Sequence, residues 1–193
     1  MTESRDELPV LDPARDALRA HVMRHSVRRG TFTLKSGATS SWFLDTKQTA
    51  CRPDGVVLMA DVGLALIPAD ATAIGGLTVG ADPVAYALAA IGATRGRTLT
   101  SFTVRKEAKD HGMRGRIAGA LSPTDQVVIT EDTVTRGTSI MEAVAVVREL
   151  GAMVVMITAI VDRGGTCGAM AEQEGIPFRP MLTAPDLGFE FGS

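Results

Sequence analysis

The sequence has few aromatic residues and no long hydrophobic run. Among 193 residues there are one Trp, one Tyr and six Phe, so the core must be built mainly from aliphatic side chains and Met. The longest apolar run, residues 152–161, is far shorter than the about 20 residues that a membrane-spanning helix needs. The first residues also lack the basic-then-apolar pattern of a signal peptide. We therefore expect a cytoplasmic protein with no membrane partner.

Neither sign of charge is in large excess, and cysteine is scarce. The 20 Lys and Arg against 22 Asp and Glu give a formal net charge of −2, so no basic field predicts nucleic-acid binding. Cys51 and Cys167 are the two cysteines, and they form no Cys-x-x-Cys motif. We interpret them as free thiols of a reducing compartment. A chain of this length buries roughly 70% of its unfolded surface and needs no disulfide or zinc to fold.

Glycine is abundant, at 20 of 193 residues, and helical and strand patterns alternate along most of the chain. Alternation of this kind is typical of an α/β fold with a mostly parallel central sheet flanked by helices. An N-terminal helix and hairpin are expected to form a small hood on it. We expect a single domain over 1–193, with the hood at about 1–50 and the α/β core at about 51–193. The expected helices are 12–27, 54–66, 83–91 and 139–150, the hairpin is 31–45, and the expected core strands are 71–74, 99–104, 126–130 and 153–161.

The most informative segment runs from Val127 to Ser139. An apolar strand leads to Glu131 and Asp132, then to a Thr-Arg-Gly-Thr-Ser turn and a helix. A helix N-terminus with small hydroxyl side chains favours phosphate binding, and Gly137 would allow the backbone to approach the anion closely. The carboxylates suit sugar hydroxyls or the water shell of Mg²⁺. In the alternative reading, Asp132 is a turn residue and Ser139 a helix cap. A Walker P-loop is excluded because no GxxxxGK[ST] motif occurs.

Two further segments follow predicted strands. Residues 104–116 carry six basic side chains, counting His111, and two glycines, which would suit a mobile lid over a polyanion. The alternative is a solvated surface loop. In residues 74–83, Gly75 and Gly76 are expected to end a strand and, with Gly80, could form a backbone nest for an anion.

Together these segments resemble the type I phosphoribosyltransferases, and among them the orotate phosphoribosyltransferases. Val127 to Ser139 looks like the motif that binds phosphoribosyl pyrophosphate (PRPP) in that family. The sequence RKEAKDHG at residues 105–112 is a close match to the mobile catalytic loop, and it is the most specific of the signals. Residues 32–37 look like the family's hairpin, and residues 161–163 look like the strand end that holds the pyrimidine.

The resemblance implies transfer of the phosphoribosyl group from PRPP to orotate in pyrimidine biosynthesis. The implied partners are PRPP and orotate, with Mg²⁺ carried mainly by PRPP. A homodimer is also implied, in which the loop at 105–112 reaches the neighbouring subunit's site. Glu131 and Asp132 would contact the ribose hydroxyls, the turn would hold the 5′-phosphate, and the loop cations would cover the pyrophosphate.

The implied roles fall on residues of this chain as follows. The implied catalytic residues are Lys106, Lys109, His111 and Asp132. The implied PRPP-binding residues are Lys35, Arg105, Lys106, Lys109, His111, Glu131, Asp132, Thr133, Val134, Thr135, Arg136, Gly137, Thr138 and Ser139. The implied orotate-binding residues are Phe43, Thr135 and Arg163, and no protein metal ligand is implied.

Several alternatives stay open at this point. Trp42 and Phe43 are adjacent on a predicted strand, so only one of them can stack on the base. Arg163 could be a surface residue after a strand, and Arg136 could face solvent or add a phosphate contact. The protein could instead act on another base, such as a purine, or sense PRPP without turnover.

A histidine pair lies outside these motifs. His21 and His25 are spaced i, i+4 on the predicted first helix, as in some metal sites. No HExxH motif and no third ligand accompany them in the sequence, which favours an ordinary surface or core role.

Overall fold

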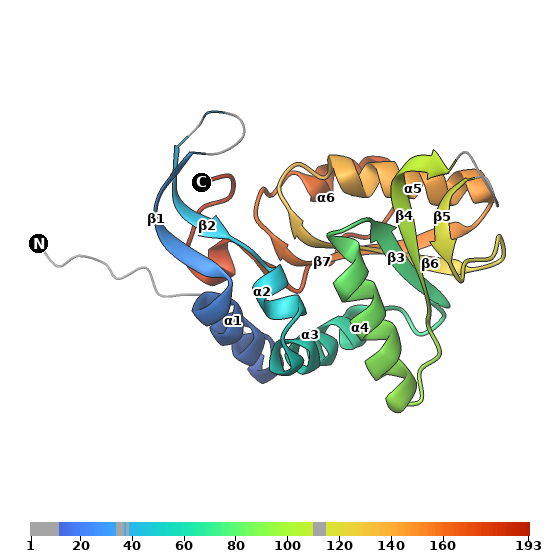
Figure 1. Cartoon of the computed structure of the whole chain (residues 1–193), viewed down its shortest axis with the longest axis horizontal. Coiled ribbons are helices and arrows are strands. Elements are labelled where there is room, and N and C mark those ends of the chain that lie inside the picture. Colours follow the sequence, from blue (N-terminus) through green and yellow to red (C-terminus); the bar gives the residue numbers. More distant parts are fainter. Residues whose placement is uncertain (1–11, 34–36, 38, 110–114) are drawn as a thin grey trace, which may run out of the picture.

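The protein is described by a computed structural model that covers residues 12–33, 37, 39–109 and 115–193. Its centre is a six-stranded sheet in the order β5-β4-β3-β6-β7-β8 (Figure 1). All neighbouring pairs in this sheet are parallel except β4 and β5. The predicted fold class, a mostly parallel sheet flanked by helices, is confirmed. The strands are β3 (Ala73–Leu77), β4 (Thr100–Lys109), β5 (Gly115–Gly119), β6 (Gln126–Val134), β7 (Met153–Asp162) and β8 (Leu182–Thr183).

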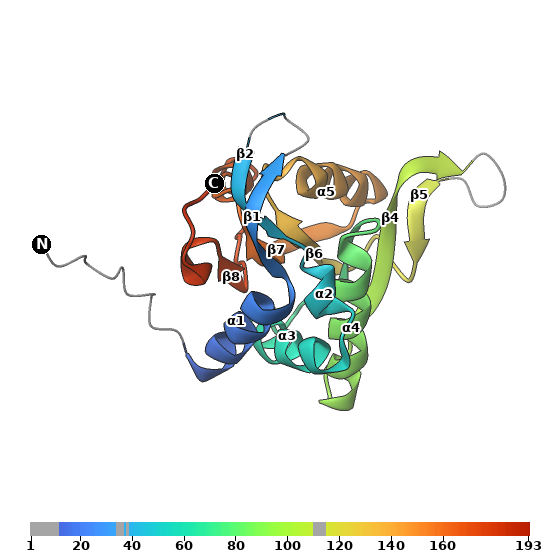
Figure 2. The ribbon, with the colours of Figure 1, turned by 60° about the vertical axis from the view of Figure 1, so that its left-hand side comes forward.

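Helices cover both faces of this sheet (Figures 1 and 2). The helices are α1 (Pro13–His25), α2 (Lys47–Ala50), α3 (Pro53–Leu66), α4 (Ala81–Thr94), α5 (Thr138–Leu150) and α6 (Cys167–Gln173), with a 3₁₀ turn η1 at Pro185–Leu187. Consecutive residues of a strand point to opposite faces. Val128 accordingly packs into the core formed with α1, α3 and α4, whereas Val127 and Ile129 pack into the core under α5 and α6.

The first helix forms as its sequence predicts. The Asp12 carboxylate accepts hydrogen bonds of 3.1 Å from the backbone N–H groups of Ala14 and Arg15, and Pro13 occupies the first turn. Such an N-cap satisfies donors that a helix end otherwise leaves free. Leu18 and Val22 are fully buried, so the face of the helix that carries them packs on the core.

The predicted end of the 71–74 strand at Gly75-Gly76 is wrong. β3 continues through both glycines to Leu77. A side chain at Gly75 would place its Cβ only 2.3 Å from the Phe102 carbonyl oxygen and 2.7 Å from the Phe102 ring. The glycines therefore allow close packing against neighbouring residues and do not break the strand.

Two predicted strands are longer than the sequence indicated. β4 does not end at 104, because Gly115–Gly119 pairs with it as an antiparallel ribbon that includes Lys109 opposite Gly115. β6 does not end at 130, because β7 pairs alongside it as far as Val134 opposite Asp162. Consequently, residues 105–109 and 131–134, which were expected in loops, lie in strands. No pattern in the sequence indicated α2, β5, α6, β8 or η1.

The N-terminal hairpin consists of β1 (Val27–Thr33) and β2 (Thr39–Leu44), which pair antiparallel. Its predicted turn includes Ser36, which lies outside the described residues. Trp42 anchors β2: its ring stacks on Phe189 with centroids 4.0 Å apart, and its Nε1–H donates to Ser193 Oγ at 2.9 Å. The hairpin is thereby joined to residues at the other end of the chain.

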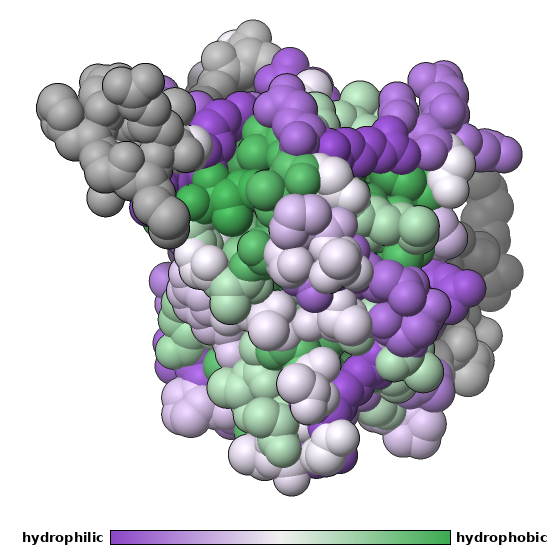
Figure 3. Space-filling view, turned by 90° about the vertical axis from the view of Figure 1, so that its right-hand side faces the viewer, coloured by the Kyte–Doolittle hydropathy of each residue, from purple (hydrophilic) through white to green (hydrophobic). Residues whose placement is uncertain are grey.

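An apolar area lies on the side of the molecule that faces right in Figure 1, and Figure 3 shows it directly. A groove of about 420 Å³ lies there between β5 and α5, with Ile117, Leu121, Val146 and Leu150 among its lining residues. Over the described part of the chain, no helix has the length and apolarity needed to cross a membrane.

Candidate active site

A polar pocket lies where β6 passes into α5. Its volume is about 200 Å³, and it is lined by Glu131, Thr133, Val134, Thr135, Arg136, Gly137, Thr138, Ser139 and Ile140. Gly137 is the N-cap of α5 and has a φ of +80°, in the left-handed region that favours glycine. No side chain of the described residues caps α5, so the N–H groups of its first turn are available to an anion.

This geometry decides the alternative reading of Asp132 and Ser139. Asp132 lies within β6 and is not a turn residue, and Ser139 lies inside α5 rather than at its cap. Arg136 is exposed and lines the pocket, so its side chain is free to approach a bound phosphate.

The two acids are buried at the end of β6 and held by their neighbours. Glu131 and Asp132 are 8% and 7% exposed. The backbone N–H of Asp132 donates to Glu131 Oε1 at 3.1 Å, and that of Thr133 donates to Asp132 Oδ1 at 2.8 Å. The Lys47 ammonium, from α2, forms an ion pair with Asp132 Oδ2.

The protonation of these groups differs sharply. Burial raises the pKa of Glu131 to about 8, with the adjacent Asp132 adding to the effect. Burial opposes the charge on Lys47, but the hydrogen bond to Asp132 and its charge outweigh that cost and raise the pKa of Lys47. At neutral pH the site therefore contains a largely protonated Glu131 beside a charged Lys47.

The segment at 74–83 contributes to the site through Gly80, which lies against the acid pair. Gly80 lies so close to the acids that a Cβ there would be 1.8 Å from Glu131 Oε1 and 2.7 Å from Asp132 Oδ1. Glycine at 80 therefore leaves room for both carboxylates. The predicted nest of three glycines is wrong, because Gly75 and Gly76 lie inside β3.

The described residues of the basic segment, 104–109 and 115–116, lie in the two strands β4 and β5. Arg105 and Lys106 lie on β4, where the Arg116 guanidinium donates to the Arg105 carbonyl at 2.8 Å and pairs with Glu142 on α5. The ribbon lies across the molecule from the β1–β2 hairpin (Figure 2). Within the described chain, no hydrogen bond or ion pair joins Arg105 or Lys106 to the acids. Lys35, His111 and the Lys109 side chain lie outside the described part.

Proteins similar to this chain include orotate phosphoribosyltransferases. No family model matches the sequence. The orotate phosphoribosyltransferase of Streptomyces avermitilis is 38% identical over 182 residues, which cover 93% of this chain and 100% of that protein. The crystal structure of Mycobacterium tuberculosis orotate phosphoribosyltransferase with Fe(III) dicitrate is 36% identical, has a TM-score of 0.81, and covers 92% of this chain and 100% of that one.

The chain belongs to the orotate phosphoribosyltransferase family. A second structure of the M. tuberculosis enzyme, in complex with PRPP, is 34% identical with a TM-score of 0.76, over 92% of this chain and 100% of that one. This membership confirms the predicted family and class of enzyme, and the rival assignments to a purine-specific relative or a PRPP sensor lose their support.

The structure distinguishes the two aromatic residues at the expected base site of this family member. Trp42 is fully buried, whereas Phe43 is 42% exposed, so Phe43 is the one that can face a ligand. Arg163 is 8% exposed, so the alternative of a surface arginine is wrong. Its guanidinium lies 4.5 Å from the Trp42 ring centroid and donates to Ser40 Oγ at 3.1 Å and to the Ser193 carbonyl at 2.8 Å.

Sequence reasoning missed Lys47 and the role of Gly80. Lys47 is a single lysine after the hairpin and forms no recognisable motif; only the folded chain shows it beside Asp132. Glu131 and residues 133–139 line one pocket together.

Proposed function

We propose that the protein joins N1 of orotate to C1 of the PRPP ribose, releasing pyrophosphate and giving orotidine 5′-monophosphate in pyrimidine biosynthesis. One observation carries the proposal: a buried acid pair directly precedes a polar pocket at the N-terminus of α5. The pocket's N–H and hydroxyl donors suit the 5′-phosphate, and the acids suit the ribose hydroxyls. The M. tuberculosis relative, which has been crystallised with PRPP, supports this choice of substrate.

The charges fit the reaction. The bond from C1 to pyrophosphate breaks as the N1–C1 bond forms and N1 loses its proton, so positive charge grows on the ribose in an oxocarbenium-like transition state. The Asp132 carboxylate, held by Lys47, would face that charge, and Arg105, Lys106, Lys109 and His111 would stabilise the pyrophosphate. Lys35 would lie at the junction of the two substrates.

We also propose Mg²⁺ as the accompanying ion. The ion would be held mainly by the PRPP phosphates and by water, and the buried carboxylates beside the pocket suit the ion's water shell. When bound, Mg²⁺ would neutralise charge on the leaving pyrophosphate.

For orotate, the proposed contacts are Phe43, Thr135 and Arg163. Phe43 is exposed beside the buried Trp42, and the Arg163 guanidinium is the cation at the end of β7 that can pair with a carboxylate. Replacing Arg163 with Ala should remove a charge-assisted hydrogen bond of roughly 1.5–3 kcal/mol. The KM for orotate should then rise much more than the KM for PRPP, and an unchanged orotate KM would remove Arg163 from the base site.

We propose a homodimer in which the β4–β5 ribbon serves the partner's site. Two features support it: Arg105 and Lys106 form no hydrogen bond or ion pair with the acids of their own chain in the described residues, and an apolar groove lies between β5 and α5. A cytoplasmic location is proposed as well, because Cys51 and Cys167 are free thiols.

The activity has a direct test. Orotate absorbance should fall only when PRPP and Mg²⁺ are both added, while uracil and adenine should be left unchanged. Turnover of adenine or hypoxanthine without turnover of orotate would contradict the assignment.

The shared site is tested by hybrid dimers. Lys106→Ala and Asp132→Asn homodimers should each be nearly inactive. After unfolding, mixing in equal amounts and refolding, about half of the dimers should be hybrids, and about one quarter of all sites should be free of both lesions. Activity should return towards that fraction. Hybrids confirmed by mass spectrometry that regain no activity would show that the ribbon serves its own subunit.

A further inference from the structure

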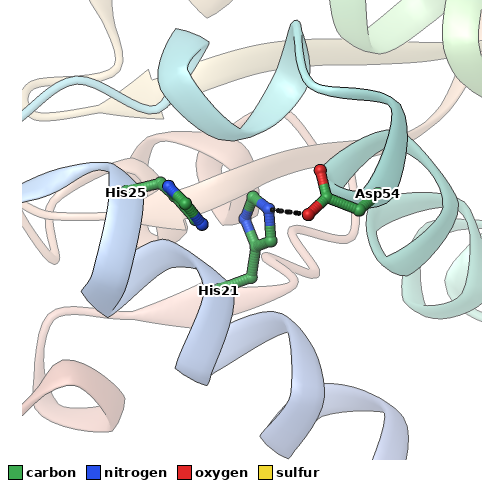
Figure 4. A group of neighbouring side chains, drawn as sticks. All are labelled: His21, His25 and Asp54. Atoms are coloured by element: carbon green, nitrogen blue, oxygen red, sulfur yellow. Dashed lines mark ion pairs between the residues drawn. The ribbon is translucent and has the colours of Figure 1, made fainter.

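Three possible metal ligands meet where α1 packs on α3. His21 and His25 come from α1 and Asp54 from the first turn of α3 (Figure 4). One ligand atom from each of the three lies within 4.8 Å of the other two. The rings of His21 and His25 also lie together, with centroids 4.5 Å apart. The third ligand that the sequence lacked near the histidine pair is thus supplied by a separate helix.

His21 is oriented as a metal ligand would be. His21 is only 8% exposed. Its Nδ1 lies 3.1 Å from the Thr49 hydroxyl, which in turn lies 2.7 Å from Ser26 Oγ. With the proton on Nδ1 donated to Thr49, Nε2 presents its lone pair. Packing also fixes the ring, because a Cβ at Gly55 would be only 2.8 Å from its Cε1.

The other nitrogen of His21 is buried without a hydrogen-bond partner. Nε2 has none among the described residues, although it lies 3.4 Å from Asp54 Oδ2. Buried polar atoms nearly always have a hydrogen-bond partner, so a buried nitrogen that has only the longer ion-pair contact with Asp54, drawn as a dashed line in Figure 4, needs an explanation. A cation bound between the nitrogen and the carboxylate provides one.

We propose that His21, His25 and Asp54 bind a zinc-like divalent transition-metal ion. Two imidazole nitrogens and a carboxylate oxygen are ligands typical of zinc, with water completing the tetrahedron. Ligands about 2.1 Å from such an ion lie about 3.4 Å apart, which matches the separation of His21 Nε2 and Asp54 Oδ2. Mg²⁺ prefers oxygen ligands and does not fit this set. The Asp54 side chain is 67% exposed, which gives the ion a path from solvent.

The ion would fasten helices that support the active site. Thr49, which holds the His21 ring, lies on α2, and the same short helix carries Lys47, the partner of Asp132. A metal between α1 and α3 would therefore stabilise the layer on which α2 rests. This role is structural, and it is separate from the Mg²⁺ that accompanies PRPP.

The test uses the full chain without a histidine tag, freed of metal by a chelator. Co²⁺ is added as a spectroscopic probe, and visible absorption should saturate at one equivalent per chain and disappear when Zn²⁺ is added. Excess Mg²⁺ should leave the signal unchanged. Zn²⁺ retained after gel filtration, measured by mass spectrometry, gives the stoichiometry independently.

Three variants assign the ligands. His25→Ala and Asp54→Asn should each weaken Co²⁺ binding by at least about tenfold. Asp61→Asn, which changes another carboxylate on α3, should bind as the wild type does. His21 is left intact, because it is buried and its loss could unfold the layer. Zn²⁺ should raise the Tm of the wild type and Asp61→Asn but not of the other two variants. The proposal would be overturned if the wild type bound no stoichiometric Co²⁺. It would also be overturned if His25→Ala and Asp54→Asn bound Co²⁺ as tightly as the wild type does.

Discussion

The two regions that carry the charges of the proposed reaction are built in opposite ways. In the segment from β6 into α5, the two acids are buried and are held by backbone N–H groups and by Lys47. The β4–β5 ribbon carries an exposed Lys106 and a half-buried Arg105, and its attachment to α5 is through the Arg116–Glu142 ion pair. One region is fixed in the folded chain, and the other presents its cations to solvent.

This difference shows how the site divides its work. Groups that are already oriented stabilise charge without reorganisation, so the acid pair and the phosphate turn are ready before substrate arrives. Exposed cations become effective only when a closing segment or a partner subunit excludes water around them. Substitutions in the ribbon should therefore change catalysis alone, whereas substitutions in the β6–α5 segment should also change stability.

The largest effect is expected on the ribbon. Lys106→Ala should lower kcat about 100- to 1,000-fold, as loss of one donor to a developing charge does. Because Lys106 is exposed, the Tm should change by no more than about 1–2 °C. Glu107→Ala is the matched control, since Glu107 is exposed on the same strand and should keep its activity. A large fall in the Tm of Lys106→Ala would mean that the ribbon is part of the fixed structure, and the contrast between the regions would fail.

Much of the fixed region could be predicted from the sequence, because its signals are local. The Asp12-Pro13 cap marks the start of α1, and the apolar strand, acid pair and Thr-Arg-Gly-Thr-Ser turn mark the passage from β6 to α5. These elements form where predicted because local propensity and burial favour the same structure there.

What could not be predicted depends on partners far along the chain. β4 extends through charged residues because β5 pairs with it, and charge alone had favoured a loop there. Arg163 is buried because Ser40 and Ser193 accept its hydrogen bonds. Likewise, Asp54 completes the histidine pair only once α3 packs on α1. No local pattern encodes these contacts.

A smaller effect is expected at the phosphate turn. Gly137→Ala forces an L-residue to a φ of +80° and should cost about 1–2 kcal/mol, or roughly 2–8 °C in Tm. Its Cβ would also lie 3.3 Å from Cys167, so the turn should shift and the KM for PRPP should rise. Gly151→Ala is the control: it ends the same helix at a φ of +98° but lies far from the pocket residues in sequence and in contacts. If the two variants had the same KM for PRPP, Gly137 would have no specific role in phosphate binding.

The last expected effect is a dependence of stability on pH that only the fixed region should show. The pKa of Glu131 is about 8 in the folded protein, against an ordinary value of 4.5. Between these values the folded chain keeps a proton that the unfolded chain releases, so the free energy of unfolding should fall as pH rises through this window. Glu131→Gln has no such proton, so its Tm should vary less than that of the wild type between about pH 5 and about pH 9, a range that covers most of this window. Glu142→Gln, which changes an exposed carboxylate on α5, should follow the wild type. Parallel profiles for Glu131→Gln and the wild type would mean that Glu131 ionises normally and that Lys47 balances two charges instead of one.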